Sequence, residues 1–397
     1  MRAGCCDEMG WRRMVSRRRL LRGGMGLALA GTAVPLRGFS VLANAQDPGA
    51  TPVGGGGAAV VAEARYPIVN GSFVAPLVED YGDVFIGQRC YIAGNTILLA
   101  GDGHQIVLGD ENNCQDNAYL LASDADLRFA NMVSIAHHAV IEDSVIGDFT
   151  FFGFRCRVRR ATIGEGAMIM HNTSVEGVEI PPNRITPMGV RITSQDQADA
   201  LPSLEEANDE FKREVQDVNL EFVDGYTRLF EERGRVALEG TSPNPITSWN
   251  PEYLDPQVGE NTTLGELVRI IGDVRLGEDS AVGQRTAIRA DEGTPIVIGR
   301  RARIQSRVTF HALKGTRLDL GANARIGDGN VLHGPLSVGD NFVTGDDCVV
   351  FRATIEDNVE LRDGATVAGE CTIREGSIVP EGAVVATQEE ADALPQR

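Results

Sequence analysis

Side chains that could do chemistry are concentrated in one stretch of the second half of the chain. Imidazole nitrogens bind metal ions or move protons, carboxylates accept protons, and guanidinium groups pair with carboxylates. The stretch reads Ile288-Arg289-Ala290-Asp291-Glu292-Gly293-Thr294-Pro295-Ile296, then Ile304-Gln305, then His311-Ala312-Leu313, then His333-Gly334-Pro335. The first half offers one comparable segment, Ser134-Ile135-Ala136-His137. These histidines could instead be ordinary surface residues. The secondary-structure elements that carry them decide whether they can meet at one site.

Aliphatic residues recur at every sixth position in the second half of the chain. They are Ile270, Leu276, Val282 and Ile288, then Ile298, Ile304 and Phe310, then Leu320, Ile326, Leu332 and Val338, then Ile355, Leu361, Val367 and Ile373. This period fits neither an α-helix nor a half-buried strand, but it is typical of a solenoid whose flat faces are one hexapeptide long. Three such faces make a triangular coil, which predicts a left-handed parallel β-helix.

The first half repeats the same period more raggedly, which indicates a tandem duplication. Both copies also end alike, at Thr193-Ser194-Gln195-Asp196-Gln197-Ala198-Asp199-Ala200-Leu201-Pro202 and at Thr387-Gln388-Glu389-Glu390-Ala391-Asp392-Ala393-Leu394-Pro395. Spaced apolar residues predict a helix after the first copy. The predicted fold is an all-β solenoid of two β-helix domains. Its expected parts are β-helix 67–202, helix 203–235, linker 236–256 and β-helix 257–397.

The N-terminus has the features of an export signal. Ser16-Arg17-Arg18-Arg19-Leu20-Leu21-Arg22 is similar to a twin-arginine motif, and an apolar run and Ala43-Asn44-Ala45 follow it. We therefore expect a signal peptide over 1–45, a flexible Gly-rich linker over 46–66, and a mature protein in the periplasm or outside the cell. No other stretch is long and apolar enough to span a bilayer, so no membrane contact is expected in the mature form.

The net charge restricts the class of partner. The formal charge is -19, with 56 Asp and Glu against 37 Lys and Arg. Nucleic-acid binding requires clustered basic residues, so we expect no nucleic-acid partner. Small anions and neutral gases remain possible ligands.

The stretch from Ile288 to Pro335 resembles the γ-class carbonic anhydrases in order and spacing, and the resemblance extends over both copies. Members of that family are left-handed β-helices that form trimers and bind zinc between subunits. The resemblance implies that His311 and His333 are the two metal ligands supplied by one subunit. It also implies that His137 matches the ligand supplied by the neighbouring subunit. Docking of one copy on the other then completes three imidazoles around a cation with a fourth position open, as in catalytic zinc sites.

The second copy has Asp328 where the family has its third histidine, which leaves an alternative open. A trimer of second copies could bind the metal through His311, His333 and this carboxylate, a ligand set that zinc accepts. The first copy, which has Leu121 at one of the two remaining ligand positions, is expected to be a degenerate site. His138 is expected to point away from His137 and into solvent.

The resemblance also implies catalytic roles in the reversible hydration of carbon dioxide to bicarbonate by metal-bound hydroxide. Arg289 and Asp291 resemble the interface ion pair, Glu292 the acidic residue beside the metal-bound water, and Gln305 a water-orienting amide. Zinc is the expected metal, with iron(II) or cobalt(II) as alternatives. A metal ion lowers the pKa of its bound water to near 7.

Two-domain chains cannot close a ring of three domains without one domain left over. We therefore expect either a homotrimer or a ring completed by a separate γ-type subunit. Two other functions remain open from the sequence. One is a catalytically inactive γ-carbonic anhydrase-like scaffold, and the other is a hexapeptide-repeat acyltransferase, which shares the solenoid but not the motifs above.

Overall fold

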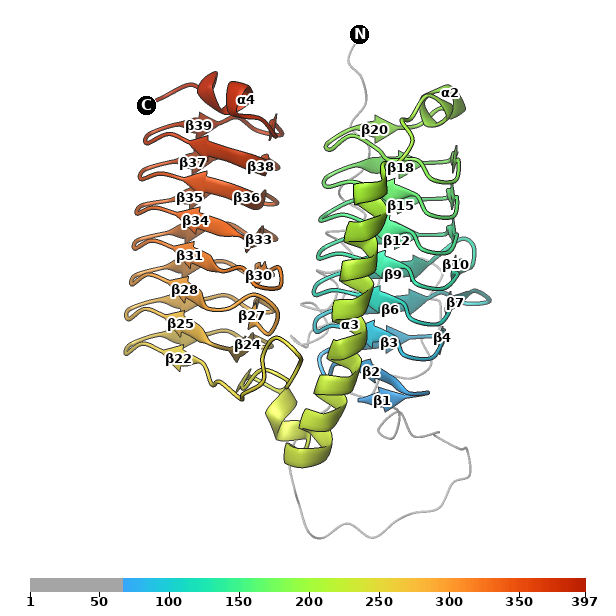
Figure 1. Cartoon of the computed structure of the whole chain (residues 1–397), viewed down its shortest axis with the longest axis horizontal. Coiled ribbons are helices and arrows are strands. Elements are labelled where there is room, and N and C mark those ends of the chain that lie inside the picture. The colour runs from blue at the N-terminus through green and yellow to red at the C-terminus, as the bar shows by residue number, and fades with distance from the viewer. Residues whose placement is uncertain (1–66) are drawn as a thin grey trace, which may run out of the picture. The chain divides into compact units, whose positions relative to one another are not determined.

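The computed structural model describes residues 67–397, all of which belong to one compact unit. They form two parallel β-helices with a long helix between them, which confirms the predicted left-handed β-helix fold (Figure 1). We call β1 to β20 with α2 the first solenoid, and β21 to β40 with α4 the second solenoid. The signal peptide predicted over 1–45 and the linker over 46–66 lie outside the described residues.

Each coil of the first solenoid adds one short strand to each of three sheets. The inner sheet, which borders α3 and the second solenoid, contains β1 (Ile68–Val69), β2 (Ser72–Val74), β5 (Tyr91–Ile92), β8 (Asn113–Cys114), β11 (Ser134–Ile135), β14 (Phe151–Phe152) and β17 (Met168–Ile169). The next sheet contains β3 (Glu79–Tyr81), β6 (Ile97–Ala100), β9 (Tyr119–Ala122), β12 (Val140–Glu142), β15 (Arg157–Arg159), β18 (Ser174–Glu176) and β20 (Arg191–Ile192). The third contains β4 (Asp83–Ile86), β7 (Gln105–Leu108), β10 (Leu127–Phe129), β13 (Val145–Ile146), β16 (Thr162–Ile163) and β19 (Glu179–Ile180).

The second solenoid repeats this plan. Its inner limb, which borders the first solenoid, contains β21 (Thr241–Ser242), β24 (Arg269–Gly272), β27 (Ala287–Ala290), β30 (Thr309–Ala312), β33 (Val331–Gly334), β36 (Val349–Ile355), β38 (Thr366–Ile373) and β40 (Val384–Val385). β36 also pairs with a second limb of β22 (Gln257–Val258), β25 (Val274–Leu276), β28 (Ile296–Ile298), β31 (Leu318–Leu320) and β34 (Leu336–Val338). The outer sheet contains β23 (Thr263–Leu264), β26 (Ala281–Val282), β29 (Arg303–Ile304), β32 (Arg325–Ile326), β35 (Val343–Thr344), β37 (Glu360–Leu361) and β39 (Ile378–Val379).

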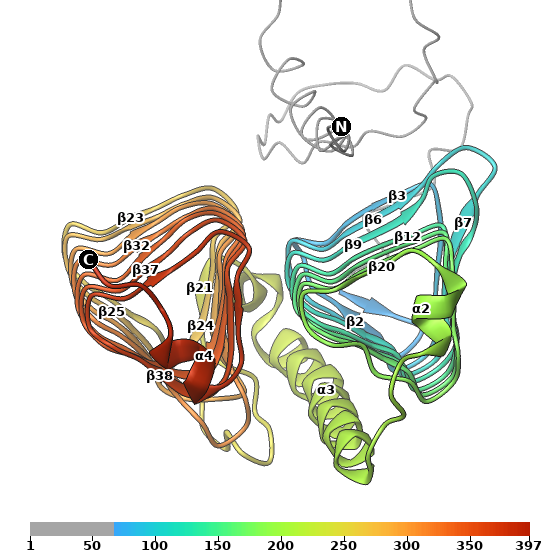
Figure 2. The same ribbon diagram turned by 90° about the horizontal axis from the view of Figure 1, so that it is seen from above.

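Seen from above, each solenoid is a triangular prism (Figure 2). The hexad residues fill the interior of each prism. Parallel pairing places equivalent residues of successive coils one above another, as in Ile270, Ile288 and Phe310, all of which are fully buried. Short helices α2 (Gln195–Asp199) and α4 (Gln388–Asp392) follow the last coils, each with a capping box. The matching ends of the two copies in the sequence therefore adopt matching structures.

A row of corner residues joins the two solenoids along their length. Asn95, Asn117, His138, Arg155 and Asn172 follow successive inner strands of the first solenoid, and all have positive φ. Their side chains cross to the second solenoid and contact, in order, Arg285, Thr309, Thr309 again, Gly329 and Thr366. The residue numbers of the contacting pairs increase along both solenoids. The two solenoids therefore run parallel and in register.

Helix α3 (Glu206–Arg233) lies against the inner sheet of the first solenoid (Figure 2), and confirms the helix predicted after the first copy. Its buried face packs with both solenoids, through Phe73 and Tyr91 of the first and Ile271 of the second. Gly234 ends the helix with φ of 72°, in the left-handed region that glycine tolerates. The interval 236–256 contains the end of η2 (Arg235–Leu238) and β21, which pairs with β24.

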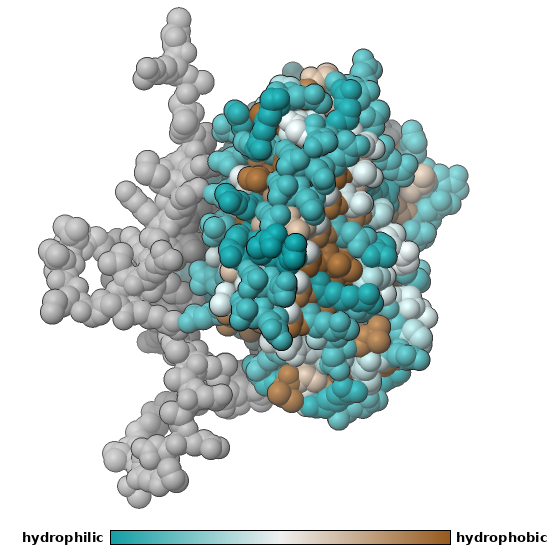
Figure 3. Space-filling model, turned by 90° about the vertical axis from the view of Figure 1, so that its left-hand side faces the viewer, coloured by the Kyte–Doolittle hydropathy of each residue, from teal (hydrophilic) through white to brown (hydrophobic). Residues whose placement is uncertain are grey.

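None of the helices in residues 67–397 is long and apolar enough to cross a membrane. The first coil of the second solenoid and the segment leading into it expose several large apolar side chains. These are Leu254, Val258, Leu264 and Leu267. The side of the second solenoid that faces away from the first is mainly hydrophilic (Figure 3).

Candidate metal centre

Three histidines converge at the border between the two solenoids. His311 on β30 and His333 on β33 are register partners on neighbouring coils, so the parallel ladder places them side by side. His137 follows β11 in the first solenoid and approaches them from the opposite side. One ring nitrogen of each lies within 4.8 Å of the others, and the three residues are 1 to 3% exposed. The structure therefore brings together the residues that the sequence assigned to one site from two separate copies.

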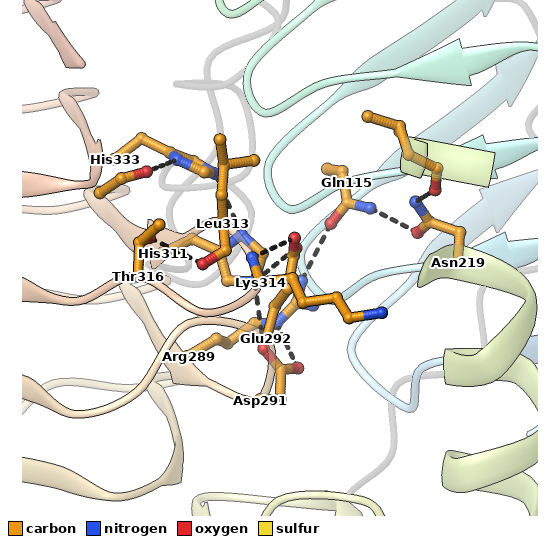
Figure 4. A network of polar contacts seen from close by, with 12 residues as sticks. Gln115, Asn219, Arg289, Asp291, Glu292, His311, Leu313, Lys314, Thr316 and His333 are labelled. Carbon is orange, nitrogen blue, oxygen red and sulfur yellow. Dashed lines mark hydrogen bonds and ion pairs between the residues drawn. The ribbon is translucent and has the colours of Figure 1, made fainter. Parts of the chain in front are cut away.

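Two of the three rings are spaced as ligands of one zinc ion. Nδ1 of His311 lies 3.2 Å from Nε2 of His333, about the separation of two ligands on one zinc ion. Their other ring nitrogens face oxygen atoms, with Nε2 of His311 at 3.1 Å from Asp291 and Nδ1 of His333 at 2.9 Å from the Gly334 carbonyl (Figure 4). Nδ1 of His137 lies 3.4 Å from Asp116, which leaves Nε2 to bind a cation. Oxygen acceptors behind ligating histidines are the usual second shell of zinc sites.

A buried ion-pair network links these carboxylates. Arg289 donates through Nε to Asp291 at 2.9 Å and through Nη1 to Asp116, and all three side chains are at most 1% exposed. Burial alone raises the pKa of Asp116, but the charge of Arg289 and the contact with His137 lower it to about 2. Burial also opposes ionisation of Asp291, yet Arg289 and His311 hold its pKa below the usual value. Both carboxylates are therefore ionised at neutral pH and orient the two histidines.

Glu292 lies beside Nε2 of His311, the ring nitrogen that also faces Asp291. Its Oε1 accepts from the backbone N–H of Lys314 at 2.8 Å, and its Oε2 lies 3.8 Å from Nε2 of His311. Burial raises its pKa, although His311 and the Lys314 hydrogen bond act in the opposite direction. A carboxyl group with a raised pKa beside a metal-binding group suits proton transfer near neutral pH.

Gln305 is not part of this centre, contrary to the role predicted for it. It follows β29 on the outer sheet, its side chain is exposed, and its backbone carbonyl accepts from Thr286. Gln115 of the first solenoid lies beside the ion-pair network of the centre instead. It is 8% exposed, its Oε1 accepts from Arg289 at 3.2 Å, and its Nε2 donates to Asn219 of α3 at 2.7 Å (Figure 4).

The physical reason is that the copies dock through different sides. The first solenoid contributes its inner sheet, whereas the equivalent side of the second solenoid is its exposed outer sheet. Gln115 lies six residues before Leu121, as Gln305 lies six residues before His311. That repeated spacing was visible in the sequence and could have identified Gln115.

Asp328 and His138 also lie elsewhere than the sequence predicted. The structure does not bring Asp328 to His311 and His333: its side chain is exposed and accepts from the backbone N–H of Ser306 at 2.7 Å. The solvated position predicted for His138 is wrong, because this residue is 8% exposed and its Nε2 lies 3.0 Å from Thr309 Oγ1. Strand alternation does not apply to His138, whose φ of 60° turns it at a coil corner against the second solenoid.

Aromatic rings form the other wall of the centre. Phe154 and Phe351 have ring centroids 4.9 Å and 5.3 Å from that of His333, and His171 stacks on Phe154 at 4.5 Å. Nδ1 of His171 accepts from the Phe154 backbone N–H at 2.9 Å, which fixes its ring. The centre therefore has one polar side, with Glu292 and Gln115, and one apolar side.

We expect the metal-free protein to lose stability as pH falls from about 6.5 to 4. Burial lowers the pKa of His137 and of His171 from 6.5 to about 4. The unfolded chain therefore binds these protons in that window and the folded chain does not, so unfolding becomes more favourable as pH falls. At pH 4.5 each of these two histidines lowers the free energy of unfolding by on the order of 2 kcal/mol relative to neutral pH. Thermal melts of chelator-treated protein between pH 7 and 4.5 measure the loss.

His171→Asn is the matched variant, because its amide oxygen can still accept from Phe154 while the titration is removed. It should reduce the acid-induced loss of stability. Protonation of carboxylates with depressed pKa values lowers stability only below about pH 4 to 5, so the loss above that range reports the histidines. A melting temperature that stays constant from pH 6.5 to 4.5 would contradict this expectation.

Comparisons with known proteins place this geometry in context. No family model matches the chain. The chain is 32% identical over 172 residues to a carbonic anhydrase of Methanosarcina thermophila, which covers 38% of this chain and 69% of the relative. It is 32% identical over 178 residues to the carboxysome assembly protein CcmM of a Nostoc species, covering 42% of this chain and 32% of the relative.

Two further matches are more distant. The mitochondrial gamma carbonic anhydrase 2 of Arabidopsis thaliana is 27% identical over 130 residues, which is 33% of this chain and 42% of the relative. A solved structure of a putative acetyltransferase from Bacillus cereus has 25% identity and a TM-score of 0.37, over 41% of this chain and 91% of that one. The alignments span about two thirds of the archaeal relative and about one third of CcmM.

Proposed function

Because the chain belongs to the γ-class carbonic anhydrase family, as a CcmM-like hexapeptide-repeat protein, we propose that it catalyses the reversible hydration of carbon dioxide to bicarbonate. The observation that carries this proposal is the convergence of His137, His311 and His333 from two copies, each with an oxygen atom behind its second ring nitrogen. These residues are proposed to hold zinc, or else iron(II) or cobalt(II). Stoichiometric metal in the purified protein, together with carbon dioxide hydration measured by stopped flow, tests it.

The residues around the histidines have separate tasks. A bound zinc ion supplies the acidity that makes water a nucleophile at neutral pH. Glu292 accepts the proton that water releases and passes it to solvent, and its raised pKa matches that task. Gln115 offers its carbonyl oxygen as an acceptor that orients the attacking water. Phe154 and Phe351 exclude water on the opposite side, where carbon dioxide, an apolar molecule, is placed against the nucleophile.

Arg289 and Asp291 act indirectly in this mechanism. Asp291 holds Nε2 of His311, so that Nδ1 would be free to bind a cation. Arg289 ties Asp291 to Asp116, which orients His137. The pair therefore couples the two solenoids to the ligand set. Bicarbonate leaves as water re-enters beside Glu292.

The two glutamines provide a test within one chain. Gln115→Ala should lower kcat/KM for carbon dioxide by about 10-fold or more, because the acceptor proposed to orient the reacting water is lost together with the hydrogen bond to Arg289. Gln305→Ala, the matched control on the outer sheet, should leave kcat/KM unchanged. Metal content must be equal in both variants. Equal activity of Gln115→Ala and the parent protein, or a loss confined to Gln305→Ala, would contradict the assignment.

A non-catalytic role is the second candidate, because three of the six relatives found are named carboxysome assembly proteins. A non-catalytic scaffold would require the solenoid fold but not metal binding by the buried histidines. Assays of metal content and hydration separate the two functions. Protein without stoichiometric metal and without hydration activity would identify the scaffold.

We also propose a ring with a separate γ-type subunit as the assembly. The intramolecular contact joins the inner sheet of the first solenoid to the inner limb of the second, so it is heterologous. The outer sheet of the second solenoid, with Arg303 and Gln305 exposed, is the equivalent of the surface that the first solenoid uses. A third domain can dock there and close the ring. Mass measurement of the purified chain, alone and co-expressed with candidate subunits, tests this.

Export by the twin-arginine route to the periplasm or beyond rests on Ser16 to Arg22 and on Ala43-Asn44-Ala45. Folded export suits a chain whose site requires both solenoids to be docked. Replacement of Arg17 and Arg18 by lysine should retain the protein inside the cell, as fractionation measures. Unchanged export of that variant would contradict the proposed route.

A further inference from the structure

A small cavity lies at the junction of the two solenoids and α3, beside the ion-pair network. Its volume is about 20 Å³, room for little more than one water-sized group. The wall is mostly apolar and includes Phe73 of the first solenoid and Ile271 of the second. Two guanidinium groups, of Arg269 and Arg289, also line it.

Arg289 has unused hydrogen-bonding capacity in this region. Its Nε and Nη1 donate to Asp291, Asp116 and Gln115, but its buried Nη2 has no partner among the described residues. A buried donor without an acceptor is unfavourable, and more so when the group is charged. Nη2 is therefore free to donate to a small bound acceptor.

Arg269 adds a second cation without a matching anion in contact. It is 5% exposed, and its partners in the described chain are neutral: the carbonyls of Gly240 and Ala237 and the hydroxyl of Ser242. Burial and the charge of Arg289 hold its pKa below the usual value, although nearby Asp291 acts in the opposite direction. Asp116 and Asp291 balance the two guanidinium charges, but both contact Arg289 and act on Arg269 only from a distance. An anion in direct contact with Arg269 would therefore stabilise this buried cation.

We propose that the cavity binds a small monovalent anion of halide size, held between Arg269 and Nη2 of Arg289. The apolar wall suits a weakly hydrated anion, which needs donors only, better than a water molecule, which needs two to four polar partners. Asp116 is the one carboxylate on the wall, and its Oδ2 faces Arg289 and His137. Bicarbonate is too large for this volume, so the site is separate from the metal centre.

Gly94 offers a variant that fills the cavity without changing any charge. A Cβ added there would have its nearest neighbours at 3.8 Å, the Asp116 carboxylate and the Leu77 side chain, so a larger side chain fits only by occupying the space. Gly94→Val should therefore exclude the anion and leave the ion pairs and the three histidines intact. Gly94→Ala is the milder variant should valine prevent folding.

The experiment compares chloride with gluconate, which is too large to enter, at equal ionic strength. The thermal midpoint of the full chain should rise by roughly 1–3 °C in chloride, and the rise should disappear in Gly94→Val. Crystals grown in bromide should show an anomalous peak between Arg269 and Arg289. Equal midpoints in chloride and gluconate, a peak at crystal concentration without stabilisation, or density for water alone overturns the proposal. None of these measurements depends on carbonic anhydrase activity.

Discussion

Replacement of His137 by alanine is expected to abolish stoichiometric metal binding, although His311 and His333 remain in place. Two imidazoles and water hold zinc far more weakly than three, and loss of one ligand from a buried site cannot be compensated by the apolar Phe154 wall. Carbon dioxide hydration should fall with the metal. The measurement is metal content after dialysis against a weak chelator, with activity in the same samples.

His104→Ala is the matched control, because His104 is partly exposed and pairs with Asp126 at the surface. Asp328→Ala should also retain full metal content, since Asp328 contacts Ser306 and not the histidines. Full metal retention in His137→Ala, with loss in Asp328→Ala, would instead support the alternative site between second solenoids. The pair of variants thus decides between the two ligand sets that the sequence left open.

The second large effect is expected from Arg289→Met, which should lower the free energy of unfolding by about 3–5 kcal/mol. Removal of the guanidinium leaves Asp116 and Asp291 both buried at 1% exposure or less without their cation. Urea unfolding of metal-free protein measures the loss. Metal affinity should fall as well, because each carboxylate orients one of the ligating histidines.

Two controls make this result interpretable. Arg275→Met removes an exposed arginine paired with Asp273 and should change stability by less than about 1 kcal/mol. The double variant Arg289→Met/Asp291→Asn should recover part of the loss, because it removes one of the two stranded charges. An unfolding curve for Arg289→Met that overlays the parent curve would show that the network is not a net stabiliser of the solenoid contact.

The hexad period was sufficient to predict the coils, because each inward residue is buried by its own repeat and by the repeats above and below. Ile270, Ile288 and Phe310 illustrate this, since each lies in register with the next. The pairing of His311 with His333 follows from the same register. Local repetition therefore determined the strands, the interior and two members of the candidate site.

The surroundings of the site depended on long-range contacts that no local pattern records. Gln115 and Gln305 occupy equivalent repeat positions, yet one is buried beside Arg289 and the other is exposed. The difference arises because the solenoids present different sides to each other. His138 was misjudged for the same reason, since it is buried by Thr309 of the other solenoid.

The sequence by itself thus determined the repeat, the duplication and the set of three histidines, because these depend on residue type and short-range spacing. Tertiary structure decided which surface of each copy is covered and which amide reaches the centre, and it placed α3 across the junction. Those outcomes depend on side chains more than a hundred residues apart, such as Asn219 with Gln115 and Arg289 with Asp116. Such contacts form only when both complete solenoids have folded and docked.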